Sequence, residues 1–292
     1  MLWVLRVQTD RTDTKIKDLV LTNGLLRRFG LEVQLYTDGE SLVDTGSKSL
    51  RPQLERLLPS LCNLKRVFVT HHHEDHVGNA RFLQEKLGVE VFAPSVALPI
   101  LSSPQGQELQ IYRKVFWGAP EPFEAKQLPD SFTLGGMAFK VIETKGHSFD
   151  HHAFFSPSSG ILISGDLVLS PFACHAMQEE DLVMEILSLK KVASLGVRKV
   201  FCAHKGIQDA LPIFAKLAFY NLVASRLRAG QTSFSSVFEE ACALGLRQIM
   251  VDIVTWGHYS VVNFVRKMQS IAKNEALFQS LFGDQSQRFQ IC

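Results

Sequence analysis

The pattern of apolar and polar positions divides the chain into two parts. Up to about residue 205, short apolar runs alternate with turn residues and helical repeats, which is typical of an α/β fold. The pairs Asp38-Gly39 and Gly135-Gly136 each separate two apolar runs and predict two hairpins. Strands are predicted at 32–36, 41–43, 66–70, 89–92, 132–134, 137–144, 153–155, 161–164 and 198–202, and helices at 79–87 and 182–195.

Beyond the last predicted strand, the apolar residues recur at helical spacing. Helices are predicted at 211–222, 237–244 and 261–272. We therefore expect one domain over residues 1–206 and an all-helical extension over residues 207–292.

The composition is that of a globular protein, with 46% hydrophobic and 21% charged residues among 292. No apolar run reaches the roughly 18 residues of a membrane span, and the start of the chain lacks a signal-peptide layout. Five cysteines are scattered without a C-x-x-C pair, which favours a reducing compartment and argues against a thiolate zinc site. These features predict a cytoplasmic protein. The net charge of +2 indicates no field that would gather nucleic acid or a membrane surface.

The densest chemical signal is the run H-x-H-x-D-H, formed by His71, His73, Asp75 and His76. It follows a predicted strand, and alternate side chains of an extended loop point the same way. His71 and His73 are therefore expected to share one metal ion, while Asp75 and His76 face a second.

Three more candidates, His147, Asp166 and His204, each follow an apolar strand directly, where α/β scaffolds present their chemistry. A single histidine in such a place is more often a capping residue, so it is the ordered set that favours a metal centre. We expect His71, His73 and His147 at one ion, Asp75, His76 and His204 at the other, and Asp166 as the bridge.

Imidazoles and carboxylates without thiolates suit two divalent ions, with zinc expected and iron or manganese as alternatives. Two ions roughly 3.5–4 Å apart share a water and lower its pKa towards about 7, which supplies a hydroxide nucleophile. Asp75 and Asp166 are the residues expected to be catalytic.

Together, T-H-x-H-x-D-H at 70–76, G-H-S at 146–148, S-G-D at 164–166 and the late His204 resemble the metallo-β-lactamase fold superfamily, in its branch with a glyoxalase II-like ligand set. The resemblance implies an αββα sandwich with a dinuclear site at one edge, and makes residues 1–206 the catalytic domain. It also implies supporting roles for Asp44, Asp150 and His151.

The leading functional hypothesis is a metal-dependent hydrolase that cleaves a small acyl substrate, such as a thioester, ester or lactone. A thioesterase fits the resemblance, whereas β-lactam hydrolysis is not expected because the second metal position lacks a cysteine. The alternatives are a phosphodiesterase or nuclease of the same fold and a metal-binding sensor with weak turnover. The expected partner is a small molecule, with no membrane or nucleic acid, and a homodimer stays open.

The substrate pocket is expected to be walled by residues 169–177 and the helical extension. Candidate contacts are Phe172, His175, Trp256, His258 and Tyr259, for which ordinary packing is the alternative.

Overall fold

The computed structural model describes residues 4–9, 15–103, 109–172, 174–230 and 252–283. The chain divides into two compact units. The first comprises residues 1–143, 150–166 and 197–208, and the second comprises 144–149, 167–196 and 209–292. The units are interleaved along the chain, because the second includes the segments 144–149 and 167–196 as well as residues from 209 on.

A seven-stranded sheet forms in the described part of the first unit, in the order β1 to β7. Its strands are β1 (Val4–Thr9), β2 (Lys17–Thr22), β3 (Val33–Thr37), β4 (Ser41–Val43), β5 (Arg66–Phe68), β6 (Glu90–Ala93) and β7 (Lys126–Gln127). The strands from β1 to β4 pair antiparallel, and those from β4 to β7 pair parallel. The predicted Asp38 hairpin is confirmed, because Asp38 Oδ1 accepts the Ser41 N–H at 2.8 Å between β3 and β4.

A second, six-stranded sheet has the order β14-β13-β11-β10-β9-β8 among the residues described. Its strands are β8 (Ser131–Leu134), β9 (Met137–Glu143), β10 (His152–Ser156), β11 (Ile161–Gly165), β13 (Lys199–Cys202) and β14 (Gly206–Asp209). The strand β14 corrects the expectation that all residues beyond 206 are helical. Residues 206–209 lack the apolar alternation of a strand, and pairing at the sheet edge decides their conformation.

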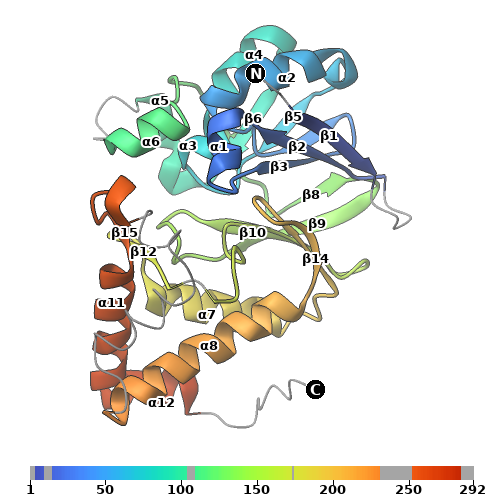
Figure 1. Ribbon diagram of the computed structural model, residues 1–292. Helices are drawn as coiled ribbons and strands as arrows, with labels where there is room; N and C mark the ends of the chain where they lie inside the picture. The colour runs from blue at the N-terminus through green and yellow to red at the C-terminus, as the bar shows by residue number, and fades with distance from the viewer. Residues whose placement is uncertain (1–3, 10–14, 104–108, 173, 231–251, 284–292) are drawn as a thin grey trace. The chain divides into compact units, whose positions relative to one another are not determined.

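The core of the first unit lies between these two sheets. The rings of Phe68 and Phe132 stack across it with centroids 3.8 Å apart. The cluster comprises Ile16, Tyr36, Val43, Phe68, Leu128, Phe132, Leu134, Phe139, Phe154, Ile161, Ile163 and Phe201. On the outer side of the seven-stranded sheet lie α2 (Arg51–Leu57) and α4 (Ala80–Leu87), as Figure 1 shows. The further α-helices described in this unit are α1 (Gly24–Arg28), α3 (Glu74–Val77), α5 (Leu98–Ser102) and α6 (Ile111–Phe116).

The second unit is mainly helical where it is described. It contains α7 (Leu182–Ala193), α8 (Leu211–Arg228), α11 (Val261–Lys273), α12 (Glu275–Phe282) and the short paired strands β12 (Ala176–Met177) and β15 (Tyr259–Ser260). The rings of Phe219 and Phe264 pack α8 against α11, with centroids 6.1 Å apart. The predicted helices at 211–222 and 261–272 are confirmed, whereas the one at 237–244 lies outside the described residues. No helix in the described ranges is long and apolar enough to cross a membrane.

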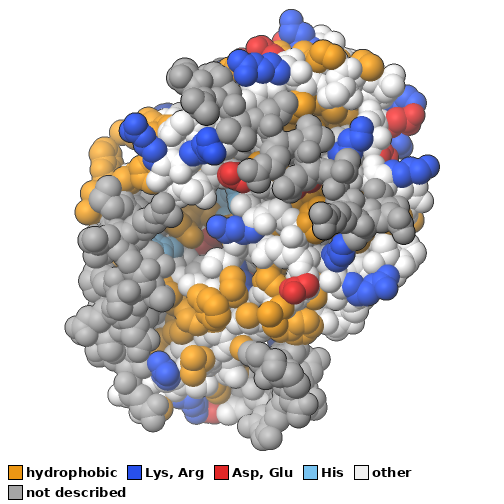
Figure 2. All heavy atoms as spheres, turned by 45° about the vertical axis from the view of Figure 1, so that its right-hand side comes forward, with side chains coloured by type: hydrophobic (Ala, Val, Ile, Leu, Met, Phe, Trp, Pro, Cys, Tyr) orange, Lys and Arg blue, Asp and Glu red, His pale blue; other side chains and the backbone are white. Residues whose placement is uncertain are grey.

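The charged side chains are dispersed on the face that Figure 2 shows. There the described Lys and Arg residues lie scattered among polar and apolar groups instead of forming one continuous stripe. This distribution agrees with the near-neutral charge of the chain.

Candidate metal centre

The histidine-rich loop begins where β5 ends and continues directly into α3. His73 precedes the helix in an extended conformation, and its carbonyl accepts the N–H groups of His76 and Val77. This tight start of the helix turns Asp75 and His76 inward. Asp75 is 7% exposed and His76 is fully buried, which is costly for polar groups unless partners are close.

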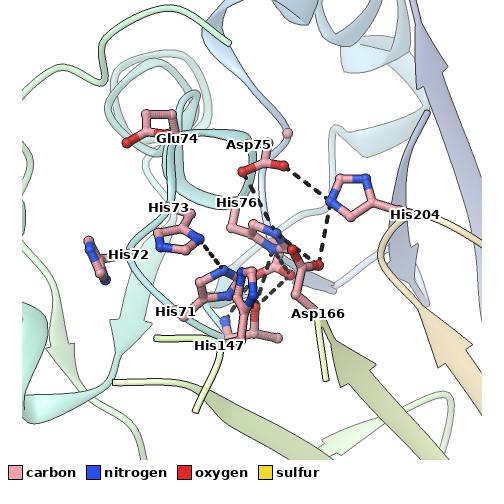
Figure 3. A network of polar contacts seen from close by, with 12 residues as sticks. His71, His72, His73, Glu74, Asp75, His76, His147, Asp166 and His204 are labelled. Carbon is pink, nitrogen blue, oxygen red and sulfur yellow. Dashed lines mark hydrogen bonds and ion pairs between the residues drawn. The ribbon is translucent and has the colours of Figure 1, made fainter. Parts of the chain in front are cut away.

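Four of the predicted ligands meet in the first unit. Each of Asp75, His76, Asp166 and His204 offers a ligand atom within 4.8 Å of those of the other three. His204 Nε2 lies 3.1 Å from Asp75 Oδ2 and 3.4 Å from Asp166 Oδ1. His76 Nε2 lies 3.3 Å from the same Asp166 oxygen (Figure 3). Three strand ends, those of β5, β11 and β13, therefore deliver one compact cluster of imidazoles and carboxylates.

His71 and His73 form a second group beside it. Their facing nitrogens, His71 Nε2 and His73 Nδ1, lie 3.0 Å apart, and both rings are buried. The third predicted member, His147, lies in the segment 144–149 of the second unit, where its Nδ1 is 2.8 Å from Glu180 Oε1. Its place at the same ion as His71 and His73 stays a prediction.

The carboxylate of Asp44 orients the His76 ring through its Nδ1 atom. Its Oδ2 lies 2.8 Å from His76 Nδ1, and its Oδ1 accepts the Thr70 N–H at 2.8 Å. Asp44 has a φ of 59°, an uncommon conformation for a residue other than glycine. Because Nδ1 of His76 is engaged by this carboxylate, Nε2 is the nitrogen left for an ion.

Asp150 and His151 support the loop and the bridge residue. Asp150 Oδ2 accepts the His72 N–H at 2.8 Å, and its Oδ1 lies 2.7 Å from His72 Nδ1. His151 Nε2 accepts the Asp166 N–H at 3.1 Å. Gly165 makes this approach feasible, because a Cβ there would lie 2.7 Å from His151 Nε2.

His204 is held by residues at alternating positions along β3 and just before it. The carbonyl of Glu32 lies 2.6 Å from His204 Nδ1, and the Gln34 N–H donates to the Ala203 carbonyl at 2.7 Å. The hydroxyl of Tyr36 donates to the Cys202 carbonyl at 2.8 Å. These three contacts between the two sheets leave Nε2 of His204 directed at Asp75 and Asp166. The sequence offered no signal for these contacts beyond the apolar alternation of β3.

The electrostatics of the cluster favour positive charge. Burial alone would lower the pKa of His76, but Asp44, Asp166 and Asp75 outweigh it and raise the pKa well above its usual value. The pKa of His204 is raised well above its usual value in the same way, since Asp166 and Asp75 outweigh its burial. In contrast, burial and the neighbouring imidazoles lower the pKa of His71 well below normal.

The residues present fit divalent metal ions. The buried His76 Nε2 makes no hydrogen bond with any residue described, although it faces a carboxylate oxygen. A cation in this place would satisfy that nitrogen and balance the carboxylates of Asp75 and Asp166. The donor set is of the mixed nitrogen and oxygen kind that zinc, iron and manganese accept.

The predicted substrate contacts all belong to the second unit. His175 Nε2 lies 3.1 Å from Asp252 Oδ1, and His258 Nε2 lies 2.9 Å from Glu179 Oε2. The remaining three are Phe172, with its ring 5.8 Å from Phe219, Tyr259, with its ring 5.4 Å from His175, and Trp256, which is 80% exposed. Their role towards a substrate stays a prediction.

The structure also places residues near the centre that sequence reasoning missed. The ring of Trp117, which follows α6, lies 6.1 Å from that of His204. Arg113 of α6 donates to Glu74 Oε2 at 2.8 Å, and both residues are buried, so α6 is tied to the start of α3, directly after the histidine-rich loop. Only the position of Glu74 inside the motif could have drawn attention to this pair.

Comparison with known proteins identifies the family. Residues 33–204, more than half of the chain, match the family model described as the metallo-beta-lactamase superfamily. A hydroxyacylglutathione hydrolase from Idiomarina loihiensis is 29% identical over 185 residues, 62% of this chain and 62% of that protein. Another, from Pseudomonas putida strain W619, is 30% identical over 148 residues, 49% of this chain and 48% of that protein. The alignments thus span about half to somewhat under two thirds of these relatives' length.

Solved structures show the same fold. A metallo-beta-lactamase family protein from Thermus thermophilus has a TM-score of 0.62 at 21% identity, covering 88% of this chain and 92% of that one. A beta-lactamase domain protein from Burkholderia ambifaria has a TM-score of 0.61 at 18% identity, covering 95% and 88%. The αββα fold predicted by resemblance, with a helical C-terminal region, is thereby confirmed. By its matching family model, its two facing sheets and its clustered histidines and aspartates, this chain belongs to the metallo-beta-lactamase superfamily.

Proposed function

We propose that the protein is a dinuclear metal-dependent hydrolase that cleaves a small acyl substrate, with a thioester as the favoured class. The observation that carries the proposal is the cluster of Asp75, His76, Asp166 and His204, whose ligand atoms lie within 4.8 Å of one another. Zinc is the favoured ion.

The chain's own residues set up this chemistry. Two bound divalent ions would lower the pKa of a water towards about 7 and polarise the carbonyl under attack. Asp166, with two carboxylate oxygens, would serve both ions. Asp75, paired with His204, would hold the second ion. His147 would complete the first ion's set with His71 and His73.

The relatives support the thioester class. The two aligned proteins from Idiomarina loihiensis and Pseudomonas putida are named hydroxyacylglutathione hydrolases, and that name describes the cleavage of a thioester. The charge balance, 31 basic against 29 acidic residues, fits a small substrate better than a nucleic acid backbone.

A substrate panel tests the proposal. Thioesters, including a hydroxyacylglutathione, lactones and phosphodiesters are assayed with zinc-loaded and chelated protein. We expect thioester cleavage that disappears on chelation and returns with zinc. Cleavage of phosphodiesters alone would favour the nuclease alternative and overturn the choice of substrate class.

Two substitutions separate an enzyme from a metal-binding sensor. Asp75→Ala should abolish hydrolysis, by at least about 100-fold, because the second ion and the water lose a holding group. Asp166→Ala should lose both ions, which metal analysis measures directly. Retention of two equivalents of zinc by Asp166→Ala would show that this residue does not bridge them.

A further inference from the structure

We propose that Glu180 is a positioning residue for the predicted ligand His147: its carboxylate holds the imidazole so that Nδ1 keeps the proton and Nε2 is left to bind the ion. The inference rests on the proposed function, because it takes His147 as a metal ligand. Neither residue types nor spacing drew attention to Glu180 in the sequence.

The geometry of the pair assigns the roles of the two nitrogens. Glu180 Oε1 lies 2.8 Å from His147 Nδ1, and Glu180 Oε2 accepts the Met177 N–H at 2.9 Å. When Glu180 is ionised, its carboxylate only accepts hydrogen bonds, and Nδ1 is then the donor. A neutral imidazole has a single N–H, which leaves the lone pair on Nε2. Such carboxylate–histidine pairs are the usual support of metal-binding imidazoles.

The burial of Glu180 gives a second reason to assign it a function. Glu180 is 8% exposed and His147 is 5% exposed, and a buried carboxylate is costly without compensation. A cation on the far nitrogen of the imidazole would offset the negative charge further.

Hydrogen bonds to two backbone carbonyls hold the segment that carries His147 against the residues that follow Glu180. The Asp181 N–H donates to the Gly146 carbonyl at 2.7 Å, and the Ser188 hydroxyl donates to the Lys145 carbonyl at 2.7 Å. At Gly146, with a φ of 139°, a Cβ would lie 2.4 Å from the backbone of Glu185. The segment that carries His147 therefore lies directly on the start of α7, whose N-cap residue Asp181 follows Glu180 in the chain.

Zinc titration of the metal-free full-length protein tests the inference. Glu180→Ala and Glu180→Gln are compared with Glu179→Gln, a matched change at the neighbouring carboxylate, which pairs with His258. We expect Glu180→Ala to weaken one of two zinc sites by about 10 to 100-fold and to leave the other unchanged. Glu180→Gln should lose less, because its amide oxygen can still accept from Nδ1. Glu179→Gln should match the wild type.

Nitrogen NMR of the histidine rings supplies a readout that a purely structural role would not move. In the wild type, Nδ1 of His147 should carry a proton before and after zinc is added, while the Nε2 shift changes on binding. A neutral ring with its proton on Nε2 would overturn the inference, as would unchanged zinc affinity at both sites of the Glu180 variants. If Glu180→Ala does not fold, as judged by circular dichroism, Glu180→Gln decides.

A His147→Ala arm separates this inference from the proposed function. If His147→Ala keeps both zinc sites at wild-type affinity, the assignment of His147 as a ligand fails and the role of Glu180 fails with it, while the two-metal centre of the proposed function stands. If His147→Ala loses one site while both Glu180 variants keep wild-type affinity, only the role of Glu180 fails.

Discussion

At the scale of single residues, three of the predicted ligands, His76, His204 and His147, share a protein group that faces their Nδ1 atom. Asp44 faces Nδ1 of His76, the Glu32 carbonyl faces Nδ1 of His204, and Glu180 faces Nδ1 of His147. Each partner favours one ring orientation, with Nε2 as the nitrogen for an ion. Changes to these partners should therefore act through metal affinity.

Asp44→Asn should weaken the site that contains His76 by about 10 to 100-fold. Asparagine tolerates the positive φ of Asp44 and has nearly the same size and shape as aspartate. The substitution therefore removes the negative charge next to His76 Nδ1 with little backbone strain. Zinc titration checks this, with the exposed Asp209→Asn as the control. Equal affinity in Asp44→Asn and the wild type would rule out the orienting role.

A second residue-scale prediction concerns Asp18, which is buried beside Gln34. Burial and the charge of Glu32 raise the pKa of Asp18 from 3.8 to about 7. The folded protein thus binds this proton more tightly than the unfolded chain does, so the stabilising effect is present below pH 3.8 and is lost progressively as the pH rises to about 7.

Asp18→Asn should make the free energy of unfolding depend less on pH in this range, because the amide does not titrate. Urea unfolding of the metal-free wild type and variant at roughly pH 5 and roughly pH 7.5, which cover the upper part of this window, gives the comparison. The loss of unfolding free energy between the two pH values should be smaller in the variant. Parallel profiles would contradict the raised pKa.

At the scale of elements, strand ends supply the chemistry, and glycines permit the close approaches around them. The segments that follow β5, β11 and β13 carry His76, Asp166 and His204, with His76 already inside α3. Positive φ values at Gly146 and Gly165 let the chain turn where any side chain would collide with a neighbour. These elements are short, so their positions depend on such contacts more than on intrinsic propensity.

Gly146→Ala should destabilise the protein by about 2–4 kcal/mol, through positive φ and the collision with α7. Thermal unfolding followed by circular dichroism measures it. Gly24→Ala is the matched control, because a Cβ there meets nothing within 4 Å and its φ is not positive. A variant at Gly146 as stable as the one at Gly24 would contradict the close approach.

At the scale of the whole molecule, the predicted metal centre links stability to protons. His76 and His204 have a raised pKa in the metal-free protein, so both hold protons that a metal ion must displace. Their stabilising effect is fully present below the unfolded value of 6.5 and is lost as the pH rises through the raised folded value.

Zinc binding at neutral pH should therefore release protons, and chelated protein should lose stability as the pH rises above 6.5. Calorimetric zinc titration in two buffers of different ionisation enthalpy detects the release as a difference in heat. Equal heats in both buffers would show that the two imidazoles carry no protons before zinc binds.

The sequence by itself determined the elements with strong periodicity and the ligand types. The Asp38-Gly39 hairpin, the strand before His71 and the helix ended by Gly88 follow from local turn chemistry and apolar spacing, which act within a few residues. The ordered set that begins with the run from His71 to His76 and continues with His147, Asp166 and His204 needed no tertiary information to indicate a metal centre. The edge strand β14 was missed because its pairing depends on β13 and not on its own residues.

Only the tertiary structure decided which distant groups serve those ligands. Glu180 lies 33 residues from His147, and the carbonyl of Glu32 lies 172 residues from His204, so no local pattern could connect them. Their partnerships arise from how whole elements pack, which depends on the summed burial of many side chains. Residue types therefore indicate the chemistry, while packing selects the tautomers and orientations of the imidazole rings that this chemistry would need.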